Sequence, residues 1–436
     1  MAVKKTIPPI TLRCARLLRR VAYRPARRIR GWQSYIRHKR LLARHRGTRP
    51  ISVMFLISNT ASWKVGPVFA RMIQDPDFEP IAAICPITGG ALLTEAKKAA
   101  ELSRVYLDSQ GFPYVNMVGL DVEQTRAEIR RIDPHLVFFT NPHNLVPTYL
   151  HQEILTSRLT CYVPYHHEVM AYGDHQEQYN QYSHNAFWRI FVSHEQSRQS
   201  YETTRIRRDA GVIVTGFPAC EPLLAPVQAR EPSPWKQQER KKKRVIYAPH
   251  WLLRPDIKMA TIDTFGEAIM NLAQKYRDDV QWALRPHPML KSSLMETLKW
   301  EPKRIEDFFS FWEQSDFCQI HEDDYLPLFL TSDAIVHDSG SFLAEYLYMK
   351  KPAMYLMTDQ TGERYFNEFG RRAIAACDIG RSSEDIERFL NQLINSENDN
   401  ENENAADRSF FTNEIAPHFQ ILPSIKICDE IRRAFS

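Results

Sequence analysis

The sequence predicts an α/β protein with two doubly wound domains in tandem and a cleft between them. Three observations support this class. From residue 51 onward, short β-type runs alternate with helical stretches, which is typical of parallel sheets covered by helices. A polar, proline-rich break at residues 222–244 divides the alternation into two halves. The length of 436 residues also exceeds what one hydrophobic core usually serves, and favours two domains of about 150–200 residues.

The first half, residues 51–221, contains seven apolar runs of strand length. Helical material separates most of them, for example at residues 91–104 and 121–132. Strands that alternate with helices form a parallel sheet, so we expect one sheet with helices on both faces. The expected strands are residues 51–58, 80–86, 114–118, 136–140, 160–165, 189–193 and 212–216.

Residues 222–244 are rich in Pro, Gln and charge, and we expect a solvated interdomain linker there. The alternation resumes in residues 245–423, and residues 424–436 are expected to add a terminal helix. The strands expected in this half are residues 245–249, 280–286, 317–320, 334–337, 353–357 and 374–378. The helices expected here are residues 261–276, 289–299, 324–331, 341–350 and 383–395, followed by 424–435.

Residues 1–50 form a strongly basic leader, with 16 Lys and Arg and no Asp or Glu. The whole chain has 57 Lys and Arg against 52 Asp and Glu. The residues after the leader therefore have a negative net charge, because they contain more acidic than basic side chains. Aromatic residues such as Trp32 and Tyr35 occur among the arginines at near-helical spacing. This pattern favours a partly helical segment that binds an anionic membrane surface through residues 1–48, over binding of nucleic acid or a merely solvated leader.

Several classes of protein are disfavoured by what the sequence lacks. The seven cysteines are scattered without a CxxC pair, which argues against a zinc site and fits a reducing cytoplasm. No window approaches the roughly 18 consecutive apolar residues of a membrane-spanning helix. Neither GxGxxG nor GxxxxGK[ST] occurs, so a dinucleotide fingerprint and a P-loop are both unexpected.

Ligands of parallel α/β sheets bind at the carboxyl ends of the strands, and there the first domain carries His166-His167-Glu168 and Gly216. A histidine beside an acid can act as a general base whose tautomer the carboxylate sets. Either His166 or His167 fits that role, and an ordinary loop histidine is the alternative. Gly216 follows the last strand and turns the chain sharply, either for structure or beside a ligand.

In the second domain, His250 follows the first strand, and Arg285 and His287 follow the next. Prolines flank these side chains and fix the backbone before a ligand binds. An Arg and a His two residues apart are suitable donors for a phosphate or diphosphate. An ordinary loop is the alternative for each motif taken alone.

The stretch Asp338-Ser339-Gly340-Ser341 joins a strand to a helix. Free amides at a helix start attract anions, and serine hydroxyls add donors. Glu345 lies one turn beyond Ser341 on the same helical face, where a carboxylate suits a ribose hydroxyl better than a phosphate. Simple N-capping by Ser339 or Ser341 is the alternative.

Together these motifs resemble the CDP-glycerol glycerophosphotransferases, the wall-teichoic-acid polymerase family of the GT-B fold. In its second domain the family has an APTW motif, an R-x-H-P motif and a D-Y-S-S motif followed by an acid and a Lys/Arg-Pro pair. The counterparts here occur in that order: YAPHWL (247–252), RPHP (285–288), and DSGS (338–341) with Glu345 and Lys351-Pro352. In its first domain the family has W-H-G-T-P and G-x-P-R segments, and the counterparts are YVPYHHEVM (162–170) and TGFPACEPL (215–223).

The chain also departs from the family's pattern. YHHEV stands in place of WHGTP, APHW in place of APTW, and Ala219 in place of the arginine in the G-x-P-R turn. The first change leaves the identity of the base open between His166 and His167. The second adds His250. These departures bear on the acceptor and on the donor's polyol.

The resemblance implies two Rossmann-like domains in the GT-B arrangement and transfer of a phospho-polyol from a CDP-activated donor to a hydroxyl of a surface polymer or lipid-linked acceptor, with release of CMP. His166 or His167 would be the base. His287 would also be catalytic, and with Arg285 and residues Ser339–Ser341 it would hold the diphosphate and stabilise the charge on the leaving phosphate. Glu345 would hold the ribose, and His250, Asp338 and Gly216 would also bind substrate. No cofactor, obligatory metal or nucleic acid is expected. The enzyme would attach peripherally to the cytoplasmic face of the cell membrane.

Two other functions are compatible with the sequence. An inverting GT-B glycosyltransferase with a nucleotide sugar, for capsule or lipopolysaccharide synthesis, would hold its diphosphate with the same groups. A non-enzymatic scaffold that binds membrane or RNA would use the basic leader alone, and its RNA binding would weaken with salt. Retention of Arg285, His287 and Glu345 argues for an enzyme.

Overall fold

A computed structural model describes residues 31–86, 93–142, 147–171, 175–206, 211–224, 233–254, 257–322, 324–358, 363–396 and 409–436. The chain divides into two compact units. Unit 1 comprises residues up to Tyr165, then Gly173–Pro218 and Ile421–Ser436, and unit 2 comprises His166–Tyr172 and Ala219–Gln420. Each unit is described by itself.

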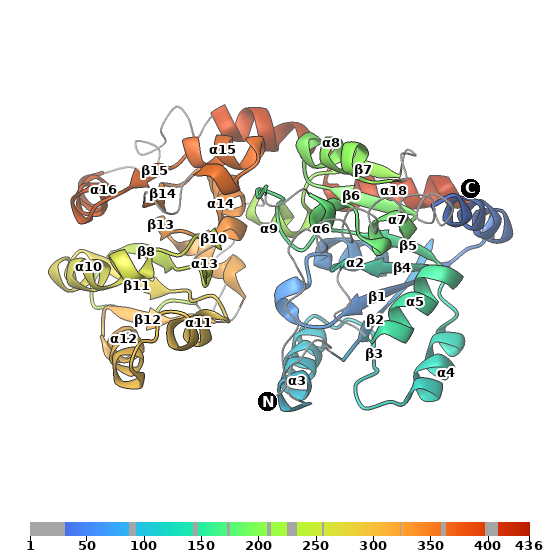
Figure 1. Cartoon of the computed structure of the whole chain (residues 1–436), viewed down its shortest axis with the longest axis horizontal. Helices are drawn as coiled ribbons and strands as arrows, with labels where there is room; N and C mark the ends of the chain where they lie inside the picture. Colours follow the sequence, from blue (N-terminus) through green and yellow to red (C-terminus); the bar gives the residue numbers. More distant parts are fainter. Residues whose placement is uncertain are drawn as a thin grey trace, which may run out of the picture. The chain divides into compact units, whose positions relative to one another are not determined.

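Unit 1 contains a seven-stranded parallel sheet in the order β3-β2-β1-β4-β5-β6-β7 (Figure 1). Alternate residues of β1 enter different cores: Phe55 packs in one and Met54 in the other. Both faces are therefore covered, as in a doubly wound domain. The strands are β1 (Ile51–Ile57), β2 (Phe78–Ile84), β3 (Tyr114–Asn116), β4 (Leu136–Phe139), β5 (Leu159–Tyr162), β6 (Arg189–Val192) and β7 (Val212–Val214).

Helices connect these strands, and a segment at each end of the chain packs on the same unit. Residues 31–45 are helical, and Gly47 N donates to Phe435 O at 2.7 Å. The terminal helix α18 (Pro423–Phe435) enters the core through Ile427 and Ile431. The other helices are α2 (Gly66–Ile73), α3 (Leu93–Ser109), α4 (Val122–Ile132), α5 (Thr148–Ser157), α6 (Gln176–Tyr179), α7 (Tyr182–Ala186) and α8 (Glu195–Thr204).

Unit 2 contains a six-stranded parallel sheet in the order β12-β11-β8-β13-β14-β15. Its strands are β8 (Lys243–Ala248), β11 (Val280–Leu284), β12 (Cys318–Ile320), β13 (Ala334–His337), β14 (Ala353–Leu356) and β15 (Asp378–Gly380), with a short hairpin of β9 (Leu253–Arg254) and β10 (Ile257–Lys258). Its helices are α9 (Glu221–Leu224), α10 (Ile262–Lys275), α11 (Leu290–Glu296), α12 (Pro302–Gln314), α13 (Tyr325–Thr331), α14 (Gly340–Tyr346), α15 (Glu368–Ala375) and α16 (Ser383–Asn395).

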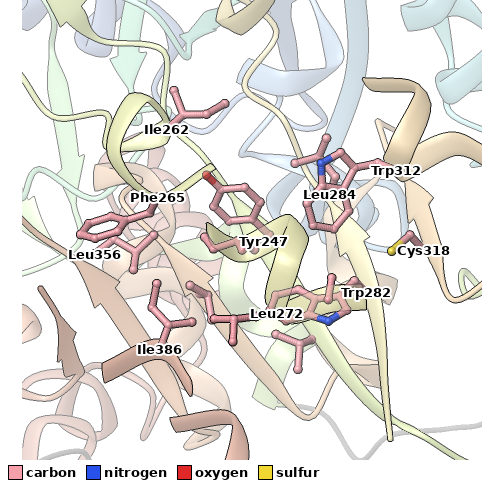
Figure 2. Packing of buried hydrophobic residues seen from close by; sticks show 14 of the residues in the cluster. Tyr247, Ile262, Phe265, Leu272, Trp282, Leu284, Trp312, Cys318, Leu356 and Ile386 are labelled. Atoms are coloured by element: carbon pink, nitrogen blue, oxygen red, sulfur yellow. The ribbon is translucent and has the colours of Figure 1, made fainter. Parts of the chain in front are cut away.

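A large aromatic core lies under one face of this sheet (Figure 2). Trp282 of β11 and Trp312 of α12 are both fully buried, with ring centroids 6.3 Å apart. Tyr247 of β8 packs against Trp312 at 5.8 Å. Because this core packs tightly against β8 and β11, the loops at the carboxyl ends of these strands start from fixed positions.

The expected solvated linker differs from what the structure shows in its second part. Residues 225–232 lie outside the described residues, but Trp235 is buried and its Nε1 donates to Thr331 Oγ1 at 2.9 Å. Lys236 N donates to Gln319 Oε1 at 2.6 Å. This part therefore packs along unit 2 because a large aromatic ring and amide side chains find partners there.

The strand expected at residues 374–378 is wrong. Helix α15 continues to Ala375, and strand β15 begins only at Asp378. Asn367 caps the helix, and Phe369, Ala373 and Ile374 share its buried face. Helical spacing of these apolar residues thus outweighs the β-type composition of the short IAACD run. Helix α12 is an addition that the sequence prediction did not include.

The predicted class, two α/β units with parallel sheets, is confirmed. The basic leader remains a prediction, because residues 1–30 lie outside the described residues and residues 31–45 pack in unit 1. Among the described residues, no helix has both the length and the apolar character needed to cross a membrane. The C-terminal helix and residues 166–172 join units other than those expected from chain order.

Candidate functional site

The three central strands of unit 2 bring the second-domain motifs to one edge of the sheet. β8 lies between β11 and β13, with Tyr247 opposite Leu284 and Ala248 opposite His337. Arg285 N continues the ladder to Tyr247 O at 2.8 Å. The loops that begin at these strand ends are therefore neighbours, as expected for a ligand site in an open α/β sheet.

Two imidazoles and an indole form a cluster at this edge. The ring centroids of His250 and His287 lie 5.4 Å apart, and those of Trp251 and His287 lie 5.7 Å apart. His250 and Trp251 follow β8, whereas His287 follows β11. The structure thus joins the APHW and RPHP motifs into one group, the strand-edge group, which comprises His250, Trp251, Arg285 and His287.

Backbone hydrogen bonds fix the tautomer of both histidines. Leu252 N donates to His250 Nδ1 at 3.2 Å, and Met289 N donates to His287 Nδ1 at 3.1 Å. Since Nδ1 is the acceptor in each neutral ring, Nε2 must carry the proton. Each ring therefore offers an Nε2–H donor.

Both rings are neutral at physiological pH. Burial lowers the pKa of His250 to about 3, with a further contribution from His287. Burial lowers the pKa of His287 to about 4, and the nearby charge of Arg285 acts in the same direction. The histidines therefore act as neutral donors, and Arg285 supplies the permanent positive charge of this group. Its Nη1 donates to His321 O at 2.9 Å, which orients the guanidinium.

The carboxylate of Asp338 ties the loops together from inside. It is fully buried and accepts from His250 N at 2.5 Å, Thr261 N at 2.6 Å and Thr261 Oγ1 at 2.8 Å. Burial raises the pKa of Asp338 to about 6, although these hydrogen bonds lower it. All three donors come from the protein itself, so Asp338 positions the His250 loop and the start of α10.

Sequence analysis missed Thr261. It is the first residue of the helix predicted at 261–276, and a threonine at a helix start is normally an N-cap. Here its hydroxyl does not cap α10, because it donates to Asp338 instead. Only the distance between residues 261 and 338 in the fold reveals this role, since nothing in the local sequence distinguishes the two uses of a threonine.

Ser339, Gly340 and Ser341 lie at the start of α14. Ser339 Oγ accepts from Phe342 N at 3.4 Å and caps the helix. A Cβ added at Gly340 would lie 3.3 Å from Met259 Cε and 3.6 Å from Met170 Sδ, so the position is closely packed. Ser341 is exposed. Of the two serines, Ser341 therefore has the more accessible hydroxyl.

Glu345 lies deeper than the strand-edge group. It is fully buried and accepts a short hydrogen bond from Tyr325 OH on α13. Burial, followed by the charge of Glu345, raises the pKa of Tyr325 well above its usual value. The role of Glu345 as a ribose ligand stays a prediction, and its contact with Tyr325 is the interaction that the structure describes.

The candidate bases His166 and His167 belong to unit 2 and have different environments. His167 is 2% exposed, and its Nε2 lies 3.1 Å from Tyr348 OH. His166 is partly exposed, and its Nδ1 lies 2.7 Å from His167 O. A carbonyl only accepts, so His166 Nδ1 carries a proton, and in the neutral ring Nε2 carries the lone pair. This tautomer is opposite to that of His250 and His287.

Gly216 lies in unit 1, just after β7, with φ of +88°. That conformation favours glycine, since other residues are strained there. The turn explains the glycine by itself, and a ligand contact at Gly216 stays a prediction. Within the described residues, no group of three or more His, Cys, Asp or Glu side chains could hold a metal ion.

A family model matches residues 164–420, which is more than half of the chain and includes every candidate site residue from His166 to Glu345. The model is that of the CDP-glycerol:poly(glycerophosphate) glycerophosphotransferases. The chain belongs to this glycerophosphotransferase family. The resemblance inferred from the motifs is therefore confirmed. No curated protein sequence matches the chain significantly.

Solved structures share the fold. The wall teichoic acid polymerase TagF, in a histidine-to-asparagine variant, superposes with a TM-score of 0.58 at 13% identity over 93% of this chain and 98% of that chain. The UDP-GlcNAc 2-epimerase from Neisseria meningitidis bound to UDP-GlcNAc gives 0.56 at 16% identity, covering 87% of this chain and 99% of that one. The UDP-N-acetylglucosamine 2-epimerase from Rickettsia bellii gives 0.54 at 15% identity, with 89% and 97% covered. At these identities the likeness shows the fold alone.

Membership of the glycerophosphotransferase family makes the chain a transferase for glycerophosphate or a related polyol phosphate. The strand-edge group fits that chemistry, because Arg285 and two neutral Nε2–H donors suit phosphate oxygens. Assignment of the individual site residues remains a proposal.

Replacing Thr261 by valine tests the Asp338 network. We expect Thr261→Val to lower the free energy of unfolding by about 1.5–3 kcal/mol, because a buried carboxylate loses one hydrogen bond. Urea denaturation measures this. Thr264→Val, on the exposed side of the same helix, is the control and should change stability by less than about 0.5 kcal/mol. Equal stability of the two variants would contradict the network.

The pH dependence of stability tests the neutral state of His287. Its pKa is lowered to about 4 in the folded state, so the stability it contributes is complete above about 6.5 and is lost as the pH falls toward 4. We expect the free energy of unfolding to fall more steeply from pH 6.5 to 4 in the wild type than in His287→Asn. Asp338 acts with the opposite sign, since its pKa is raised, but it is present in both proteins and cancels in the difference. Parallel curves would rule out a neutral, buried His287.

Proposed function

We propose that the protein transfers a phospho-polyol unit of the glycerol phosphate type from a CDP-activated donor to an acceptor hydroxyl in the synthesis of a cell-surface polymer. His166 Nε2 takes the proton from that hydroxyl. The oxygen then attacks the β-phosphorus, the bond from the β-phosphorus to the bridging oxygen breaks, and CMP leaves with that oxygen. The acceptor is a growing polymer or a lipid-linked primer.

The strand-edge group stabilises the departing phosphate. Arg285 supplies a permanent charge, and His250 and His287 each supply an Nε2–H donor. Because both imidazoles are neutral, each donates a hydrogen bond through Nε2–H and adds no charge to the site. Ser341 and the neighbouring amides of residues 339–341 add donors, and Asp338 holds His250 in place. Glu345 reaches the nucleotide's ribose only after a rearrangement of Tyr325.

The observation that carries this proposal is the contrast between tautomers. His166 donates through Nδ1 to a carbonyl and so keeps a lone pair on Nε2, as a base requires. His250 and His287 accept at Nδ1 and so present Nε2–H, as an anion site requires. One family motif thus supports proton removal, and two support charge stabilisation.

A donor screen tests the proposal. CDP-glycerol, CDP-ribitol and a panel of UDP-, GDP- and CMP-sugars are compared for protection against thermal unfolding, because a ligand that binds only the folded state raises the midpoint. We expect a CDP-polyol to protect and to yield CMP when an acceptor is added. Protection by a nucleotide sugar alone would instead support a glycosyltransferase.

Replacing His166 tests the base. With the donor found by that screen, His166→Ala should reduce kcat by about a hundredfold or more while donor binding is retained, since the base acts on the acceptor. Rapid-quench measurement of CMP release gives the rate. His45→Ala, a half-buried histidine of unit 1, is the control and should keep its rate. A His166→Ala enzyme with normal turnover would exclude this residue as the base.

We also propose that the leader attaches the enzyme to the cytoplasmic face of an anionic membrane. Ten of its 16 Lys and Arg lie in residues 1–30, and in the following helix Trp32 is 64% exposed and Tyr35 38% exposed. Exposed aromatic rings among basic residues suit a bilayer surface. Because residues 31–49 pack in unit 1, the deletion should stop at residue 30.

Removal of residues 1–30 should weaken sedimentation with anionic phosphatidylglycerol vesicles, and high salt should weaken it further in the full chain. Neutral phosphatidylcholine vesicles are the control. If the shortened protein pellets with anionic vesicles as well as the full chain does, residues 1–30 are not the anchor.

A further inference from the structure

The segment that carries the proposed base is fastened to unit 2, although the residues on both sides of it belong to unit 1. Its main chain forms hydrogen bonds to the stretch before α15. Asn367 N donates to Val169 O at 2.9 Å, and Ala171 N donates to Tyr365 O at 2.6 Å. Met170 pairs with Phe366 as an antiparallel bridge. Residues 166–171, the base segment, are thus held to the rest of unit 2 by these hydrogen bonds and one isolated bridge.

Asn367 joins the base segment to α15 through one side chain. Its Nδ2 donates to Glu168 O at 2.5 Å, while its Oδ1 accepts from Gly370 N at 2.8 Å and caps the helix. Together with its backbone N, Asn367 therefore holds two successive carbonyls of the segment. The fit is tight, because a Cβ at Gly370 would lie 2.3 Å from Val169 O.

His167 acts as a second anchor. Its ring stacks on Phe369 with centroids 5.9 Å apart and planes at 17°, and its Nε2 meets Tyr348 OH. Because His167 is buried between these groups, it is not placed to take a proton from an acceptor. It instead holds the segment that carries His166. The choice between the two adjacent histidines therefore favours His166 as the residue that reaches the acceptor.

The carbonyl of His167 connects these anchors to the tautomer of His166. It accepts from His166 Nδ1 at 2.7 Å and from Val169 N at 2.9 Å, which closes a tight turn. The direction of that carbonyl depends on where Glu168 and Val169 are held. Asn367 binds the carbonyls of both residues.

We propose that Asn367 is a positioning residue for the base: by clamping residues 168 and 169, it aims the His167 carbonyl at His166 Nδ1 and thereby keeps the His166 lone pair on Nε2. This inference rests on the proposed function. It also means that the base moves as part of unit 2, the unit that carries the phosphate donors, and not with the unit whose sequence surrounds it.

Asn367→Asp separates positioning from stability. Aspartate is as good an N-cap as asparagine, so α15 keeps its cap. The Nδ2–H donor is lost, and a carboxylate oxygen is placed against Glu168 O. We expect a folded protein with a lowered thermal midpoint, because Glu168 O loses its buried donor. Measured well below that midpoint, kcat should fall about ten- to a hundredfold with little change in donor KM, and the acidic limb in the pH profile of kcat should shift.

Nitrogen-15 NMR of histidine-labelled protein reports the tautomer without any need for activity. The His166 signals, assigned by their loss in His166→Ala, should show a protonated Nδ1 in the wild type and a mixture of tautomers in Asn367→Asp. Asp121→Asn, which exchanges the cap of α4 in unit 1, is the matched control and should alter neither kcat nor the His166 signals. Asn367→Ser, which keeps a capping hydroxyl for α15 but removes the Nδ2–H donor to Glu168 O, is the second variant if Asn367→Asp fails to fold, and it should give the same mixture of tautomers.

The outcomes separate this inference from the proposed function. A wild type that turns over no CDP-polyol refutes the proposed function, and the NMR result then decides the role of Asn367 alone. Unchanged His166 signals in a folded Asn367→Asp, or in Asn367→Ser if that is the variant used, overturn the inference. So does an unchanged pH profile with normal kcat.

Discussion

The site depends on one buried carboxylate. Asp338 follows the central strand β13 and accepts hydrogen bonds from the loop after β8 and from the start of α10. A buried charge is costly unless its oxygens are satisfied, so the surrounding backbone must adopt the arrangement that supplies donors. That requirement orients His250, and through the contact of the imidazole rings it also constrains where His287 lies.

Burial then determines the chemistry of the two imidazoles. In water a histidine is partly protonated near neutral pH, but at this sheet edge desolvation keeps both rings uncharged. Backbone amides at Nδ1 decide which nitrogen holds the proton. The positive charge of this group is therefore concentrated on Arg285, and the histidines offer directional hydrogen-bond donors. The Nδ1 of His166 faces a carbonyl instead of an amide, so the backbone there favours the opposite tautomer.

Chain order and spatial organisation differ at two places. Helix α18 leaves the second half of the sequence and packs in unit 1, while residues 166–172 leave the first half and pack on unit 2. Each crossing has a local cause: α18 buries Ile427 and Ile431 in the core of unit 1, and the base segment gives its carbonyls to Asn367. As a result, the proposed base and the strand-edge group, whose hydrogen-bond donors are proposed to bind phosphate, belong to the same unit.

The sequence by itself determined the class of fold, most strand positions and the set of motifs that define the family, because alternating apolar patterns and strand-end residues are local properties. It failed at residues 374–378, where helical packing of Phe369, Ala373 and Ile374 overrode a β-type run, and at Trp235, whose burial depends on distant partners. It did not distinguish His166 from His167, and it assigned no role to Thr261 or Asn367. Only the tertiary structure decided the local environments of these residues, since burial and the pairing of residues 261 with 338 and 168 with 367 arise from contacts between segments far apart in the chain.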